Sequence, residues 1–186
     1  MEPLKVSRSL KVLGIETSTL QCEIALALDH QVLASARLPA DSRPTAVLAP
    51  TIRDLCRSLG WSPRELNLIC VDQGPGSYTG LRVGITCAKT LAFAAGADLA
   101  TVGSLEAVAN NSPIGEQLVE VAFDAARGQV FACRFRRDTE FWTAIDEVRI
   151  VVAEDWARGL DPSALITGPA LEKYRGLLPT TLHIAD

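Results

Sequence analysis

The stretch QGPGSYTGLRVG, residues 73–84, decides how the first half of the chain is organised. It follows LNLICVD, an apolar run typical of a buried strand, and precedes a long segment with helical spacing. Phosphate often binds where a strand ends in a glycine-rich turn before a helix, because free N–H groups and the helix dipole converge there. The stretch is therefore either a nucleotide site or a structural turn.

The residues of this stretch favour the structural turn. A Walker-type phosphate loop places a lysine directly after its last glycine, whereas Gly80 is followed by Leu81 and Arg82. The glycine spacing does not complete the dinucleotide-binding motif either. We expect a sharp turn into a helix, capped by a hydroxyl side chain. The residues assigned to this turn are Gly74, Pro75, Gly76, Ser77 and Thr79.

The segments around the turn predict an α/β fold. Runs rich in β-formers before it predict a three-stranded meander, and apolar residues at helical spacing predict one helix on either side of it. Pro50 marks the first turn or a kink of the earlier helix, which stops at Gly60. The predicted elements are strands at 11–16, 21–28 and 32–38, a helix at 46–59, a short helical turn from Ser62, a strand at 66–72, a helix at 78–95, a strand at 99–102 and a helix from Ser104.

The second half of the chain repeats the opening pattern. Turn-forming residues cluster at 110–116, so we expect one domain over 1–112 and another over 113–186. Residues 118–135 again form a strand ending in an acid, a polar turn and a second strand, which places Asp124 where Glu16 fell. This repetition suggests a duplicated α/β unit, as in the two-lobed actin, Hsp70 and sugar-kinase architecture, where two such turns hold ATP phosphates across a cleft.

Composition excludes several classes of protein. The 186 residues are 48% hydrophobic with a formal net charge of -4 and no lysine- or arginine-rich run, which argues against strong direct binding to nucleic acid. The N-terminus has no apolar signal core and no segment is long and apolar enough to span a membrane, so we expect a cytoplasmic protein. Five widely spaced cysteines without a Cys-x-x-Cys pair suggest buried, reduced thiols: Cys22, Cys56, Cys70, Cys87 and Cys133.

Three segments together resemble the TsaB family, the non-catalytic partner subunit in bacterial synthesis of threonylcarbamoyladenosine on tRNA. They are IETSTLQCEIAL, VDQGPGSYTGLRVG and AFDAARGQVFACRF, and the resemblance extends over roughly residues 11–175. TsaB proteins are glycoprotease-like and related to TsaD, the metal-dependent catalytic subunit. Two departures stand out. Residue 45 is Thr where members often have His, and relatives usually continue beyond LLPTTLHIAD, which implies a shortened second lobe.

Small residues recur every four positions in the helix after the turn, at Gly80, Gly84, Ala88 and Ala92. Glycine in a helix interior costs about 1 kcal/mol relative to alanine, so close packing is expected to offset that loss. The packing partner is either the chain's own sheet or another protein. The resemblance implies the second, because the family uses this helix and the one at 46–59 to form homodimers and to dock TsaD. The expected interface residues are Leu48, Ile52, Leu55, Gly80, Leu81, Gly84, Ala88 and Ala92.

The acids at the two hairpin turns are the candidates for chemistry. Glu16 and Asp124, with Thr17, could contact a nucleotide or a metal ion across a cleft. The alternative is that both acids cap or brace their own turns, and Arg127 is placed to pair with Asp124. No lysine lies near either acid, which favours this alternative.

The histidines argue against a catalytic site. His30 and His183 are the only two, so the His-x-x-x-His metal pair of TsaD-like proteins is absent, and no G-x-S-x-G motif presents a serine. The resemblance implies a scaffold or activating subunit that docks a TsaD-type subunit, with ATP and metal on the partner subunits, a TsaE-type ATPase as a further partner, and only indirect contact with tRNA; the histidine pattern agrees with this expectation. The alternatives are a stand-alone glycoprotease-like peptidase or ATPase that uses Glu16 and Asp124, and a stand-alone dimeric regulator.

Overall fold

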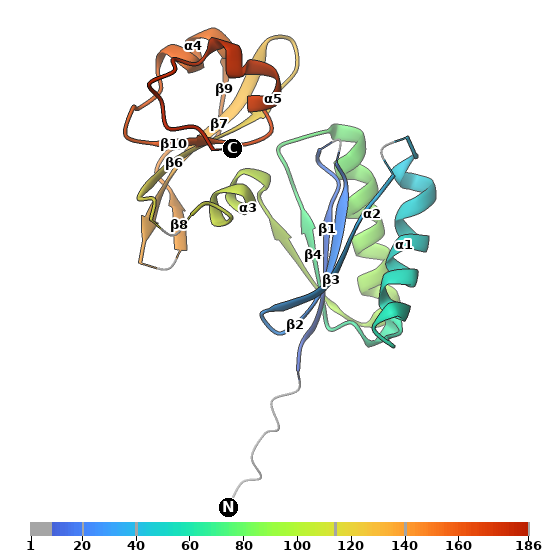
Figure 1. The fold of residues 1–186 in the computed structure, drawn as a ribbon. Helices are drawn as coiled ribbons and strands as arrows, with labels where there is room; N and C mark the ends of the chain where they lie inside the picture. Colours follow the sequence, from blue (N-terminus) through green and yellow to red (C-terminus); the bar gives the residue numbers. More distant parts are fainter. Residues whose placement is uncertain (1–8, 20, 40, 114, 140, 186) are drawn as a thin grey trace, which may run out of the picture. The chain divides into compact units, whose positions relative to one another are not determined.

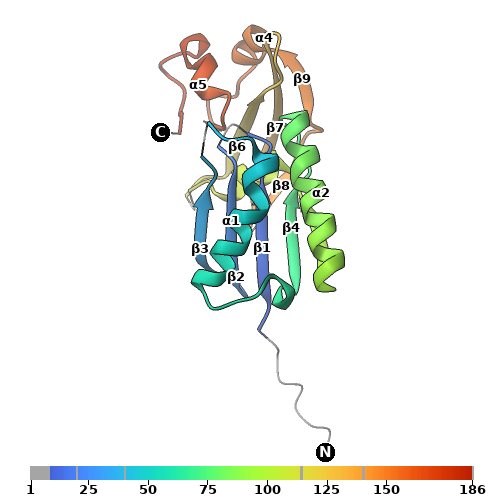
Figure 2. The same ribbon diagram turned by 90° about the vertical axis from the view of Figure 1, so that its right-hand side faces the viewer.

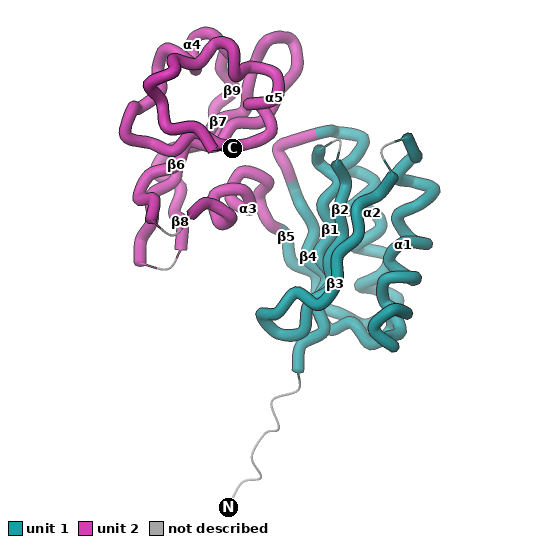
Figure 3. Tube along the Cα trace, viewed as in Figure 1, with its two compact units in different colours: residues 1–73, 77–101 teal, residues 74–76, 102–186 magenta. Residues whose placement is uncertain are grey.

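The computed structural model describes residues 9–19, 21–39, 41–113, 115–139 and 141–185. Contacts divide the chain into unit 1, Met1–Gln73 with Ser77–Thr101, and unit 2, Gly74–Gly76 with Val102–Asp186 (Figure 3). The division lies earlier than the expected boundary at residue 112, because helix α3 (Ser104–Asn110) packs on the strands of unit 2.

Unit 1 is a five-stranded sheet with two helices on one face (Figures 1 and 2). The strand order is β3-β2-β1-β4-β5; the first three strands form the predicted antiparallel meander, and β4 lies parallel to β1. The elements are β1 (Lys11–Glu16), β2 (Glu23–Leu28), β3 (Gln31–Arg37), α1 (Pro44–Ser58), η1 (Pro63–Glu65), β4 (Leu68–Asp72), α2 (Tyr78–Ala95) and β5 (Asp98–Val102).

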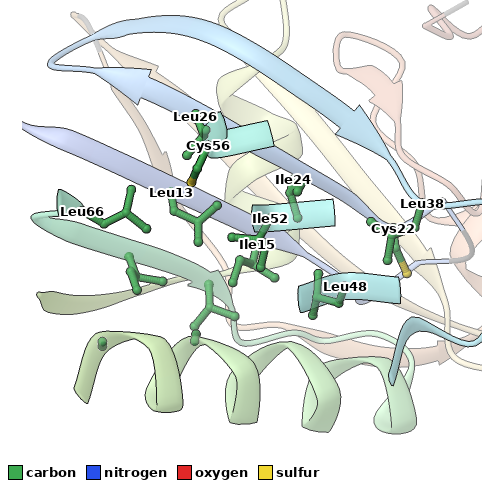
Figure 4. Close-up of a cluster of buried hydrophobic side chains, with 14 residues drawn as sticks. Leu13, Ile15, Cys22, Ile24, Leu26, Leu38, Leu48, Ile52, Cys56 and Leu66 are labelled. Carbon is green, nitrogen blue, oxygen red and sulfur yellow. The ribbon is translucent and has the colours of Figure 1, made fainter. Parts of the chain in front are cut away.

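The core of unit 1 lies between the sheet and the two helices (Figure 4). Alternate residues of β1, such as Leu13 and Ile15, point into it, as the period of two in a strand requires. Leu48, Ile52 and Cys56 of α1 recur at helical spacing and meet them. Each fully buried leucine or isoleucine contributes about 1.5–3 kcal/mol, so this cluster holds α1 against the sheet.

The helix ends follow the local signals in the sequence. Pro44 occupies the first turn of α1, and Pro50 lies inside the helix. Ser62 and Glu65 form a capping box at η1, as their spacing predicts. At α2 the capping hydroxyl is that of Ser77, which accepts a hydrogen bond from the Gly80 N–H at 3.2 Å.

Unit 2 is built around a second sheet of order β10-β6-β7-β8, with β9 also paired to β7. Helix α3 packs on one face, and α4 and α5 pack on the other. Besides α3, the elements are β6 (Leu118–Asp124), β7 (Gln129–Asp138), β8 (Phe141–Ala144), β9 (Arg149–Val152), α4 (Ala153–Arg158), β10 (Leu165–Thr167), α5 (Leu171–Tyr174) and η2 (Arg175–Leu177).

The predicted repetition is confirmed at the level of strands. In each unit a central strand, β1 or β6, runs antiparallel to the strand that follows it and parallel to a later one, β4 or β10. Glu16 ends β1 and Asp124 ends β6. The two acids therefore occupy equivalent places in their own sheets.

Candidate functional site

The small-residue stripe of α2 faces the chain's own sheet. Gly80, Gly84, Ala88 and Ala92 are all buried. A Cβ atom on Gly80 would overlap the backbone carbonyl of Thr17, and one on Gly84 would overlap the Thr17 hydroxyl. The prediction that these four residues form a partner surface is therefore wrong. Gly80 and Gly84 are small because the hairpin turn between β1 and β2 lies directly against the helix, whereas Ala88 and Ala92 pack in the hydrophobic core of unit 1.

The predicted interface residues of α1 are also core residues. Leu48 and Ile52 are buried, and the partly buried Leu55 packs against the same cluster. Leu81 of α2 is partly buried. The predicted interface residues are apolar and recur at the helical period. Side chains with this pattern form the face of a helix that packs on the core, so here they hold the two helices to the sheet. A docking surface on these helices must use their other faces.

Such a surface exists as a groove between α1 and α2. Its volume is about 550 Å³, and most of its lining is apolar. At its rim, the Arg82 guanidinium lies 5.5 Å from the centroid of the exposed Tyr78 ring, an arrangement that suits cation–π attraction. The sequence identified the two helices and, of the lining residues, only Leu48 as an interface residue; the lining residues of α2 lie beside the buried stripe. The groove is lined by Pro44, Thr45, Leu48, Ala49, Thr79, Arg82, Val83, Thr86, Cys87, Thr90 and Leu91.

The first turn of α2 is occupied by the chain itself. The Ser77 N–H donates to the Ser18 carbonyl at 2.7 Å, and the Thr17 hydroxyl donates to the Gly80 carbonyl at 2.9 Å. Thr17 is almost fully buried between the strand and the helix. The hairpin turn thus fills the place where a phosphate would meet this helix N-terminus, so residues 73–84 form a structural turn, the alternative that the sequence favoured.

Glu16 caps its own hairpin turn. Its Oε1 accepts hydrogen bonds from the Ser18 N–H and hydroxyl, both at 2.6 Å, and from the Thr19 N–H at 3.1 Å. Its Oε2 accepts from the Thr19 hydroxyl at 3.2 Å. Four donors from two residues, Ser18 and Thr19, engage the carboxylate, which is the turn-capping role that the sequence left open.

Asp124 braces the corresponding turn of unit 2 with a partner that the sequence did not predict. Its Oδ2 accepts from Lys173 Nζ at 3.0 Å, and its Oδ1 accepts from the Tyr174 hydroxyl at 3.0 Å and the Ala126 N–H at 3.1 Å. The charged partner is thus Lys173, and the predicted pairing with Arg127 is wrong: Arg127 is exposed, in a left-handed conformation with φ of 52°. Burial alone would raise the pKa of Asp124, but the three hydrogen bonds lower it.

The lowered pKa of Asp124 predicts a pH-dependent contribution to stability. A carboxyl whose pKa is lower in the folded state stabilises the fold above its ordinary pKa of about 3.9 and loses that contribution as the pH falls through the folded value. We expect Asp124→Asn to lower the free energy of unfolding at pH 7 by less than about 1 kcal/mol, because the ion pair is solvent-exposed. Urea denaturation at several pH values should show this difference shrinking below pH ~4. The matched control is Asp138→Asn; a cost of Asp124→Asn that stays constant with pH would contradict the prediction.

Unit 2 contains a buried polar cluster that the sequence did not predict. Glu120 of β6 is 2% exposed, and its Oε1 accepts from Arg149 Nη2 at 3.0 Å and from Trp156 Nε1 at 3.1 Å. Arg134 Nε lies 3.8 Å from its Oε2. Burial raises the pKa of Glu120, and Arg149, Trp156 and Arg134 act in the opposite direction. The one feature of the sequence that points to this cluster is the acidic residue in the middle of the apolar strand LVEVAFD.

The described part of the chain holds neither a metal-ligand cluster nor a helix suited to a membrane. Within it, no three His, Cys, Asp or Glu side chains lie close enough together to hold a metal ion. We also find there no helix with the length and apolarity that crossing a bilayer requires. Of the five cysteines, Cys22, Cys56 and Cys133 are buried, and burial raises the pKa of the Cys133 thiol to about 11.

Comparison with solved structures defines the class: a mixed α/β protein with two sheets and the YeaZ fold. The structure matches YeaZ from Pseudomonas aeruginosa with a TM-score of 0.80 over 95% of this chain and 84% of that chain, at 24% sequence identity. A family model described as "TsaD: tRNA N6-adenosine threonylcarbamoyltransferase" matches residues 40–172.

Curated relatives give the particular family. The TsaB protein of Bacillus subtilis is 32% identical over 79% of this chain, and that of Escherichia coli is 32% identical over 69% of it; both are described as tRNA threonylcarbamoyladenosine biosynthesis proteins. The chain belongs to the TsaB family, within the wider group that the TsaD model describes. The matched region spans 64% of the B. subtilis protein and 56% of the E. coli protein.

Proposed function

We propose that this chain is a non-catalytic scaffold or activating subunit in the synthesis of threonylcarbamoyladenosine on tRNA, and that it docks a TsaD-type catalytic subunit. The names of its curated relatives support the process. The observation that supports docking is the open, largely apolar groove between α1 and α2. An open groove with a mostly apolar lining can accept apolar side chains of another protein, which is why we place the docking surface there.

The hydrogen bonds that Glu16 and Asp124 make at their own turns support a non-catalytic role. Glu16 is held by its own hairpin, and Asp124 by Lys173 and Tyr174. In this proposal ATP and the metal ion belong to the partner subunits, which include a TsaE-type ATPase, and the partners supply the contacts with tRNA. The proposal also places the protein in the cytoplasm and assigns the two units to the lobes of an actin-like fold.

Charged substitutions in the groove test the docking surface. Ala49 of α1 and Thr86 of α2 are exposed and line the groove. We expect Ala49→Arg and Thr86→Arg to change the free energy of unfolding by less than about 0.5 kcal/mol, as surface substitutions do. Each should weaken binding of the TsaD-type subunit by at least about tenfold, because an unpaired charge is costly at an apolar interface. Calorimetric titration against that subunit measures the effect.

The control for this experiment is Val32→Arg on the exposed edge strand β3 of the same unit. It adds the same charge away from the groove and should leave binding unchanged. We further propose that the isolated chain forms a homodimer through the same groove, so sedimentation equilibrium should show weaker self-association for Thr86→Arg. Unchanged binding by both groove variants would place the docking surface elsewhere.

The isolated chain is expected to bind ATP only weakly. No lysine follows the glycine turn, and the first turn of α2 is filled by Thr17 and Ser18. Calorimetry with ATP and Mg²⁺ should give no stoichiometric binding at micromolar concentrations of nucleotide. A tight, magnesium-dependent site that Asp124→Asn abolishes would instead support a stand-alone ATPase.

A further inference from the structure

Strand β9 of unit 2 presents apolar side chains to solvent. Val148, directly before the strand, and Ile150 and Val152 within it alternate along the chain and are 51%, 60% and 43% exposed. The intervening residues point the other way: Val151 packs against the core under α4, and Arg149 bonds to Glu120. These three apolar side chains therefore form an exposed row that is not part of the hydrophobic core of the described chain.

This row lies on an open sheet edge. In the described part of the chain β9 pairs with β7 alone, and Figure 2 shows it at the margin of its unit. Natural proteins blunt such edges with proline, bulges, charged side chains or very short strands. Strand β9 has no proline and its pairing with β7 has a continuous register, but it is only four residues long and its one charged side chain, Arg149, is 45% exposed while it bonds to Glu120. In the described part of the chain its main chain is open on the side away from β7, which is the arrangement that β-strand addition uses.

Acidic residues flank the strand on both sides. Asp146 and Glu147 precede it, and Glu154 and Asp155 follow it. Asp146 pairs with Arg134 and Asp155 pairs with Arg158, so Glu147 and Glu154 provide the unbalanced negative charge at the two ends. A second copy of the chain, paired antiparallel about Ile150, would bring acidic flanks against acidic flanks. Charge complementarity therefore favours a different partner.

We propose that the edge of β9 binds an extended segment of a protein partner, with alternating apolar residues bordered by lysine or arginine. The segment adds a strand beside β9, its apolar side chains cover Ile150 and Val152, and its basic ends meet Glu147 and Glu154. Main-chain hydrogen bonds would provide affinity, and the charged ends would select the partner. This surface is independent of the groove between α1 and α2.

The test uses two synthetic peptides against the full chain. The probe is Arg-Lys-Val-Thr-Ile-Thr-Val-Lys-Arg, and its control has glutamate and aspartate in place of the four basic residues. Fluorescence anisotropy at low salt should show at least tenfold tighter binding of the basic peptide, with the preference reduced at high salt. Amide chemical shifts should change within residues 146–154. Equal binding of both peptides, or shifts confined to other residues, would overturn the proposal.

Variants separate strand addition from general electrostatic attraction. Ile150→Arg should weaken binding of the basic peptide at least tenfold, whereas Val32→Arg, on the edge strand of unit 1, should leave it unchanged. The double substitution Glu147→Lys and Glu154→Lys leaves the apolar row intact and should reverse the preference between the peptides. Binding that survives Ile150→Arg would contradict the proposal. Self-association that Ile150→Arg abolishes, without peptide binding, would show that the occupant is a second copy.

Discussion

Gly84→Leu is expected to destabilise unit 1 by about 3 kcal/mol, the combined effect of over-packing and a lost buried hydrogen bond. A side chain at this position meets the Thr17 hydroxyl, with the Ile15 side chain 3.6 Å from the Cβ position. The hydroxyl donates to the Gly80 carbonyl in a buried site, so moving it away breaks that bond. The better helix propensity of leucine offsets less than about 1 kcal/mol of this cost. For a unit of this size the melting temperature should fall by more than about 10 °C.

The matched control is Thr86→Leu, two residues further along the same helix. Thr86 is exposed at the groove, so the same new side chain should change stability by less than about 0.5 kcal/mol. Thermal denaturation measures the stability of both variants, and binding of the proposed TsaD-type subunit is measured on the folded fraction. Together the two measurements show whether position 84 belongs to the core or to a partner interface. If Gly84→Leu kept its melting temperature and lost only binding, the buried stripe would be a partner surface after all.

Glu120→Leu should lower the stability of unit 2 by about 2–4 kcal/mol, because it breaks a buried, hydrogen-bonded ion pair from one side. The substitution leaves Trp156 Nε1 without its acceptor inside the protein and removes the anion that faces Arg149. Both arginines of the cluster are partly exposed and can recover some hydration, which keeps the cost below that of a fully enclosed pair.

Two further variants make the Glu120 result interpretable. Glu120→Gln keeps an acceptor for Trp156 and should cost less than Glu120→Leu. Glu172→Leu, at an exposed position of α5, should be close to neutral. Chemical denaturation followed by tryptophan fluorescence measures all three. A Glu120→Leu protein as stable as the wild type would show that apolar packing replaces this ion pair at no net cost.

Local patterns predicted the elements of the first 135 residues because each pattern spans only one element. Alternation, helical spacing and the capping box at Ser62 need no knowledge of distant residues, and the structure confirms the strands and helices they indicated. Beyond residue 135 the described strands and helices are short, and five of those that begin there have only three or four residues. Such segments give too few periods for a pattern to emerge.

The sequence by itself determined that residues 73–84 turn a strand into a helix, that the opening pattern recurs at Asp124, and which family the chain belongs to. Only the tertiary structure decided what the small residues of α2 contact, because a stripe of glycine and alanine has the same period against a sheet as against a partner. It also decided the partners of Asp124, since Lys173 lies 49 residues away along the chain. Close packing and ion pairs depend on distance in space, and local sequence encodes only distance along the chain.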